Sequence, residues 1–185
     1  MKLKILLFLF IVLSIHASAQ DSSQSEVKAS IGLKAGLNCS SFSPAEFSDY
    51  RISYQLGIVT HWQLAQYDYI VGELLFSNEG DDAVFLKGYY NILMPILYKR
   101  DLSNWLSLEL GPQGSLNIGY AKSDNIWGAV FAPDNNFSLA FCAGLAAYVD
   151  DRNYFNLRVA KGVTPVFKDP DSFNTVFSLC YVKIL

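Results

Sequence analysis

His61 is the first residue to consider for chemistry, because the chain's other histidine lies in an N-terminal segment that we expect to be removed. A hydrolase with a Ser–His–carboxylate relay, or a metal site with a histidine ligand, would have to be built on His61. No nucleophile-elbow sequence, phosphate-binding glycine loop or metal-ligand spacing accompanies it. We therefore predict no catalytic residue, no metal and no cofactor, and expect an interior or rim imidazole. A lipid-modifying enzyme that uses His61 is kept as an alternative.

Five charged residues occupy positions that alternation places on one side of the predicted strands: Lys34, Glu73, Lys87, Glu109 and Arg158. Charges in a narrow interior are tolerated when they are paired and hydrogen-bonded. We predict that these side chains form one connected network that fills the interior. A gated solute path lined by the same residues is the alternative.

Apolar and aromatic residues also occur in a long polar stretch, 121–136, and they are Ile126, Trp127, Val130 and Phe131. Exposed residues of this kind in a loop are candidates for recognition of a partner. The loop could equally fold over the end of the barrel and bury them. If the protein has a binding function, this loop is the first place to look.

Three cysteines, Cys39, Cys142 and Cys180, are spaced in a way that fits no metal motif. We expect three free thiols packed as small side chains within strands. A disulfide between Cys142 and Cys180 is the alternative.

The beginning of the chain has the form of a secretory signal peptide. Lys2 and Lys4 precede the apolar run 5–13, and an Ala-Ser-Ala sequence ends at Ala19. We expect residues 1–19 to be a signal peptide cleaved near Ala19, residues 20–29 to be a flexible leader, and residues 30–185 to form one domain. The net charge of −3 gives no basic surface, so we expect no nucleic-acid partner.

The segment 105–120 shows how the domain is built. Its alternate residues are apolar on one side and mostly Gly, Ser, Asn and Gln on the other, which is the two-residue period of a strand. At about 3.3 Å per residue the segment is long enough to cross a hydrocarbon layer while tilted. A face toward bulk water would be richer in Lys, Glu and Thr, whereas small neutral residues suit a narrow lumen. We therefore predict that Leu106, Leu108 and Leu110 face lipid.

Eight segments alternate in this way, and they are 30–40, 52–64, 67–77, 84–99, 105–120, 137–149, 154–164 and 175–185. An even number allows an antiparallel barrel to close. The connections alternate between short (65–66, 100–104 and 150–153) and long. Short periplasmic turns and long extracellular loops are typical of barrels in the outer membrane. The pattern predicts an all-β fold, an eight-stranded antiparallel up-and-down transmembrane β-barrel.

Short sequences made of structural residues also carry a family resemblance. Gly32–Asn38 (GLKAGLN), Gly72–Ser77 (GELLFS), Leu108–Gln113 (LELGPQ) and the closing Val176–Leu185 (VFSLCYVKIL) resemble the small PorT-like outer-membrane β-barrel proteins of Bacteroidetes. The likeness covers nearly all of the expected mature chain. It implies an outer-membrane location in a Gram-negative bacterium and allows an accessory role in secretion.

We expect a non-enzymatic barrel with a structural, adhesive or accessory role in the cell envelope, exerted through its outer loops. The expected partners are outer-membrane lipid, the barrel-assembly machinery, and an extracellular or envelope protein. An exported soluble barrel similar to a lipocalin, with its apolar face turned inward around a small ligand, is kept as an alternative.

Overall fold

The computed structural model describes residues 28–43, 50–80, 89–120, 135–168 and 171–185, and these residues are built almost entirely of β-strands. The strands are β1 (Ala29–Ser43), β2 (Arg51–Ala65), β3 (Asp68–Glu79), β4 (Tyr89–Ser103), β5 (Leu106–Tyr120), β6 (Phe137–Asp150), β7 (Asn153–Gly162), β8 (Phe167–Lys168) and β9 (Asp171–Ile184). No helix among these residues is long and apolar enough to cross a membrane.

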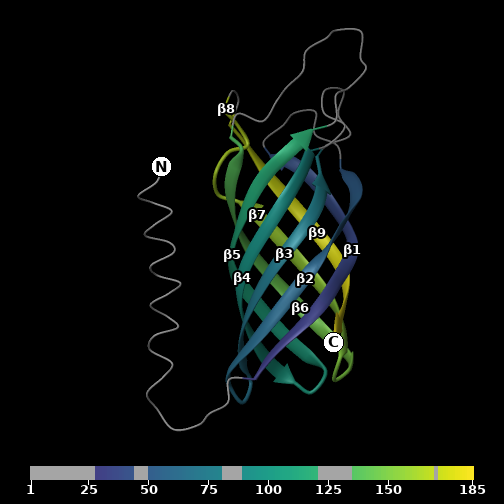
Figure 1. The fold of residues 1–185 in the computed structure, drawn as a ribbon. Coiled ribbons are helices and arrows are strands. Elements are labelled where there is room, and N and C mark those ends of the chain that lie inside the picture. The colour runs from purple at the N-terminus through teal and green to yellow at the C-terminus, as the bar shows by residue number, and fades with distance from the viewer. Residues whose placement is uncertain (1–27, 44–49, 81–88, 121–134, 169–170) are drawn as a thin grey trace.

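Every long strand pairs in antiparallel fashion with its neighbour in the chain, and β1 pairs with β9 to close the sheet. The result is a closed barrel of eight tilted strands (Figure 1). The two-residue β8 lies outside this ring as a short hairpin arm on β9. The predicted fold class, an eight-stranded antiparallel up-and-down barrel, is confirmed.

The apolar stripe of each strand faces outward. Leu33, Ile58 and Leu74 lie side by side on β1, β2 and β3, and each side chain is between 41% and 53% exposed. The alternate positions point into the lumen, where Lys34 is 1% exposed and Glu73 7%. The soluble, lipocalin-like alternative is therefore wrong, because it required the apolar face to surround the axis.

Side chains fill the lumen at several levels between its ends. Near one end, Val59, Val71, Leu97 and Val182 are completely buried. In the middle, the Gln55 amide and the Cys180 sulfur are in contact, and the Cys142 thiol donates to Gln113 Oε1 at 3.3 Å. Cys39, Cys142 and Cys180 are all free, as expected.

The connections are sorted by end. Tight turns at 66–67, 104–105 and 151–152 share one end of the barrel, and the strand ends that the longer connections join lie at the other. β9 begins at Asp171, four residues before the predicted strand, because β1 pairs with it as far as Phe173 and β8 pairs with Ser172 and Asp171. β1 likewise begins one residue before the predicted domain boundary, at Ala29.

Candidate functional site

The charged residues of the lumen meet at one level of the barrel, closer to the tight turns than to the loops. Lys34 Nζ lies 3.0 Å from Glu73 Oε1 and donates to Asn156 Oδ1 at 2.9 Å. Arg158 donates to both oxygens of Glu73, at 2.7 and 2.8 Å, and to Glu109 Oε2 at 2.8 Å. Asn156 Nδ2 also donates to Glu109, at 2.8 Å. These residues come from β1, β3, β5 and β7, so the network ties four strands together across the lumen.

Glycines on neighbouring strands are paired with two of the long charged side chains. Gly57 of β2 is paired with Lys34, and Gly144 of β6 is paired with Arg158. A Cβ on Gly144 would lie 2.8 Å from the Leu157 carbonyl oxygen and 3.2 Å from the Arg158 Cβ. A side chain at this position would crowd the base of the arginine, which is why the small residue is needed there.

Four of the five residues predicted to share the lumen are therefore in contact with one another: Lys34, Glu73, Glu109 and Arg158. Lys87 lies outside the described residues. The guanidinium of Arg158 is held by paired hydrogen bonds on Glu73 and a further one on Glu109, which is the geometry that arginine forms best with carboxylates.

Lys99 belongs to this network, although sequence reasoning did not single it out. Its Nζ is 3.7 Å from Glu109 Oε1 and lies over the rings of Tyr154 and Tyr148, at 4.0 and 4.8 Å from their centroids. Lys99 is completely buried, and its ammonium makes no hydrogen bond within the described part of the chain. The sequence contained the information needed to find it, because Lys99 continues the alternation of inward-facing residues on β4 that includes Leu97.

A second polar cluster lies near the loop end, and it too was not predicted. The Glu79 carboxylate is buried and accepts from Asn174 Nδ2 at 2.7 Å, Asn91 Nδ2 at 3.0 Å and Ser77 Oγ at 3.0 Å. Its donors are neutral. Glu79 also continues an inward alternation, beyond the point at which the third strand was expected to end.

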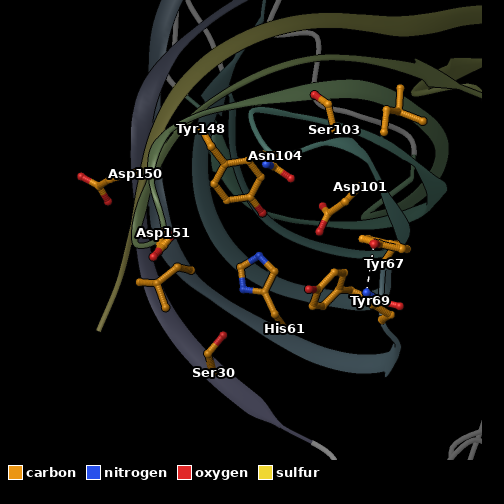
Figure 2. Close-up of a pocket in the computed structure, with 13 residues that line it drawn as sticks. Ser30, His61, Tyr67, Tyr69, Asp101, Ser103, Asn104, Tyr148, Asp150 and Asp151 are labelled. Carbon is orange, nitrogen blue, oxygen red and sulfur yellow. Dashed lines mark hydrogen bonds between the residues drawn. The ribbon is translucent and has the colours of Figure 1, made fainter.

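The lumen opens at the turn end into a cavity of about 590 Å³, which we call the turn-end vestibule. Its lining includes Ser30, His61, Tyr69, Asp101, Tyr148 and Asp151, which come from the ends of five strands and the turns between them. In Figure 2 the side chains of His61, Tyr69, Asp101 and Tyr148 are turned toward a common space. The vestibule was not predicted, because its lining combines turn residues and strand ends that are distant in sequence.

The charged side chains among the vestibule's lining residues are three aspartates, Asp101, Asp150 and Asp151. Asp101 accepts a hydrogen bond from the Ser107 hydroxyl. Asp150 closes the β6–β7 turn, where the backbone N–H of Arg152 and the amide of Asn153 donate to it, both at 2.8 Å. These hydrogen bonds hold the pKa of the Asp150 carboxyl below its usual value.

His61 lies at the inner wall of the vestibule and is 7% exposed. Its Nε2 is 3.0 Å from the Tyr154 hydroxyl, and its Nδ1 is buried without a hydrogen-bond partner. A hydrolytic relay needs a nucleophile on one ring nitrogen and a carboxylate on the other. The tyrosine contact and the unpaired nitrogen do not supply that arrangement. His61 also faces the lumen, away from the surface that acyl chains would reach.

Within the described residues, no group of three or more His, Cys, Asp or Glu side chains is arranged to hold a metal ion. The predicted recognition residues Ile126, Trp127, Val130 and Phe131 lie outside the residues that the structure describes.

Comparison with solved structures finds the same barrel in proteins of low sequence identity. The structure of Ail, the attachment invasion locus protein of Yersinia pestis, is 12% identical, with a TM-score of 0.56 over 85% of this chain and 99% of that one. The structure of the outer membrane protein Ail in a phospholipid bilayer nanodisc is 12% identical, with a TM-score of 0.52 over 85% of this chain and all of that one. Neisserial surface protein A is 14% identical, with a TM-score of 0.53 over 84% and 98% of the two chains.

These similarities show a shared fold, the closed eight-stranded barrel of small outer-membrane proteins. No family model matches this chain, and no curated protein matches it either.

Proposed function

We propose that this chain is a non-enzymatic outer-membrane β-barrel protein of a Gram-negative bacterium, exported with a signal peptide that is cleaved near Ala19. The observation that carries the proposal is the ring of exposed apolar side chains around a barrel whose lumen holds a buried network of charges. A protein in water would gain free energy by reversing these two faces, since burial of apolar area is the main favourable term in folding. In a membrane, acyl chains surround the apolar side chains, so their outward position carries no such free-energy cost.

Aromatic residues at both ends of the apolar surface support a membrane position. Trp62, Tyr67, Tyr98, Trp105 and Tyr181 are exposed toward the turn end, and Tyr50, Tyr54 and Phe137 toward the loop end. Tyr54 and Trp62 are eight residues apart on β2. At about 3.3 Å per residue and a tilt of about 40°, they are separated by about 20 Å along the barrel axis, close to the height of a lipid-facing band.

The filled lumen argues against a role as an open channel. The charge network, the Gln55–Cys180 and Gln113–Cys142 contacts and the Glu79 cluster follow one another along the axis. Eight strands enclose an interior that side chains can fill. A gated solute path would require this whole series of contacts to separate. The charged network is therefore proposed to be structural.

Because side chains fill the lumen, we assign the contacts that this barrel makes with other molecules to its ends. We place the longer connections outside the cell and assign them an adhesive role or contact with an extracellular or envelope protein. Residues 126–131 are the first candidates for that contact. The attachment and invasion named for Ail, which shares the fold, support adhesion as the role to test first.

Membership of the PorT-like family, with an accessory role in secretion, remains part of the proposal through the resemblance of the strand sequences. The partners during assembly are outer-membrane lipid and the barrel-assembly machinery.

Cell fractionation combined with heat-modifiable gel mobility tests the location. We expect the protein in the outer-membrane fraction, and we expect unboiled samples to migrate faster than boiled ones because a closed barrel resists detergent. Recovery of folded protein from the periplasm without detergent would contradict the proposal.

A further inference from the structure

The unpaired nitrogen of His61 is the starting point for a function of the turn-end vestibule. The imidazole is 93% buried, lines the cavity, and has no hydrogen-bond partner for Nδ1. A buried polar atom without a partner is costly, and each such atom in a folded protein calls for an explanation. When Nε2–H donates to the Tyr154 hydroxyl oxygen, Nδ1 keeps a lone pair that can accept a hydrogen bond. Nδ1 is buried in this arrangement, so a donor in the vestibule reaches it once the imidazole ring turns toward the cavity.

The other polar atoms around this space are also mainly acceptors. Asp101 accepts from Ser107 Oγ at 2.5 Å, which leaves most of the lone-pair sites of its carboxylate for other donors. The hydroxyl groups of Tyr69 and Tyr148 converge on the same space and can each accept a further hydrogen bond (Figure 2). A primary ammonium group has three N–H donors and no acceptor, so it complements this lining.

The charge balance favours a cation. The vestibule is lined by Asp101, Asp150 and Asp151, and its described lining residues include no lysine or arginine. The Lys99 ammonium lies over the rings of Tyr148 and Tyr154. Asp150 is turned away from the space and accepts from the β6–β7 turn, so Asp101 and Asp151 are the lining carboxylates left for a ligand (Figure 2). An anionic ligand would therefore be repelled.

The size and the apolar lining fit a short chain between two charged ends. A volume of about 590 Å³ lies in the range of small-molecule sites. Leu102 and Ile184 also line the vestibule and offer contacts to methylene carbons, while Asp151 supplies a second carboxylate. Tyrosine faces add favourable contacts to an organic cation.

We propose that the turn-end vestibule binds a small organic cation with a primary ammonium group, in particular an aliphatic diamine. One ammonium lies against Asp101, with Tyr69, Tyr148 and His61 Nδ1 as its further acceptors. The second lies toward Asp151. The vestibule is at the end of the barrel that carries the tight turns, so under the proposed membrane orientation the ligand enters from the periplasm.

Calorimetric titration of the full chain, purified from membranes in detergent, tests this inference. The probe is 1,4-diaminobutane, and the matched compounds are neutral 1,4-butanediol and anionic succinate. We expect saturable binding of the diamine and no binding of the other two. Absence of saturable diamine binding, or binding of succinate, would overturn the proposal.

Three variants locate the site. Asp101→Asn removes a charge-assisted contact and should weaken diamine binding by about tenfold or more. Asp68→Asn is the control, since Asp68 has the same charge at the same end of the barrel but pairs outside with Arg100 at 3.4 Å. It should leave affinity within about twofold, because exposed pairs contribute little. Equal weakening by both variants would overturn the assignment.

Tyr148→Phe removes one acceptor while keeping the ring, and it carries the test if Asp101→Asn does not fold. We expect several-fold weaker binding with heat-modifiable mobility unchanged. Unaltered affinity in a folded Tyr148→Phe protein would remove the proposed ammonium position. These outcomes are independent of the membrane location, which fractionation tests separately.

Discussion

Arg158 is the residue on which the buried charges depend. It is 4% exposed and donates to both Glu73 and Glu109, which come from β3 and β5. Three cations, Lys34, Lys99 and Arg158, face these two carboxylates, so the network carries one positive charge in excess. The carboxylates are held by hydrogen bonds from more than one direction, and loss of the central donor would leave them without their strongest partner.

Replacing Arg158 with methionine should therefore destabilise the barrel by about 3–5 kcal/mol, the usual cost of leaving a buried charge without its partner. Equilibrium unfolding in urea, followed by gel mobility in detergent micelles, measures the change. Lys161→Met is the matched control on the same strand, because Lys161 is exposed and donates to Thr175 at 2.8 Å. Its cost should be under about 1 kcal/mol. Similar losses for both variants would show that the buried network contributes little.

At the scale of the strand, alternation assigns each residue to lipid or to lumen. Ile58 lies midway between Tyr54 and Trp62 on β2, and its neighbours in register are Leu33 of β1 and Leu74 of β3. These three exposed side chains form a continuous apolar row across adjacent strands. If the row meets the centre of the bilayer, a charge placed in it has no access to water.

Ile58→Arg should destabilise the protein folded in lipid vesicles by about 2–4 kcal/mol, whereas Leu64→Arg, beyond Trp62 on the same strand, should cost about 0–1 kcal/mol. Equilibrium urea titrations in the same vesicles give both values. The depth dependence is the critical result. Equal tolerance at the two positions would mean that the row does not lie in hydrocarbon.

Strand ends were less accurately predicted than strand faces. The third strand was expected to end at residue 77, whereas β3 continues to Glu79, and Glu79 is the centre of the cluster at the loop end. The inward position of Glu79 follows from the same alternation as Glu73. It was missed because Asn, Glu and Gly together indicate a loop by composition, while cross-strand pairing with Tyr89 keeps the residue in the sheet.

At the scale of the molecule, the sorting of connections predicts a direction in the membrane. Tight turns at 104–105 and 151–152 should face the periplasm, and the connection 121–136 should face the outside of the cell. An epitope tag inserted between Asn125 and Ile126 should bind antibody on intact cells. A tag inserted between Asp151 and Arg152 should bind only after the outer membrane is permeabilised. The reverse pattern would invert the proposed orientation.

The filled lumen also predicts electrical behaviour. Purified protein added to a planar lipid bilayer should produce no stable conductance steps, because the buried clusters occupy the axis at several levels. A general porin inserted under the same conditions serves as the positive control. Reproducible steps of defined size would favour the gated solute path over a structural network.

The sequence by itself determined the strands, their faces and the sorting of the turns. Each of these is a local property: a two-residue period places Ser107 and Glu109 on one face and Leu108 and Leu110 on the other wherever the strand lies. The number of alternating segments then limited the fold to a closed barrel, and low charge with small lumen residues favoured lipid outside. For Lys34, Glu73, Glu109 and Arg158, the sequence predicted only that they share the interior in one network. It did not predict which of them are in contact.

Only the tertiary structure decided which charges meet, that Lys99 lies over two tyrosine rings with no hydrogen-bond partner among the described residues, and that the turn ends enclose a cavity around His61. Those features depend on how far each strand is shifted against its neighbour and on closure of β1 against β9. Register and closure are set by pairing between residues far apart in the chain, and alternation within a single strand contains no information about them.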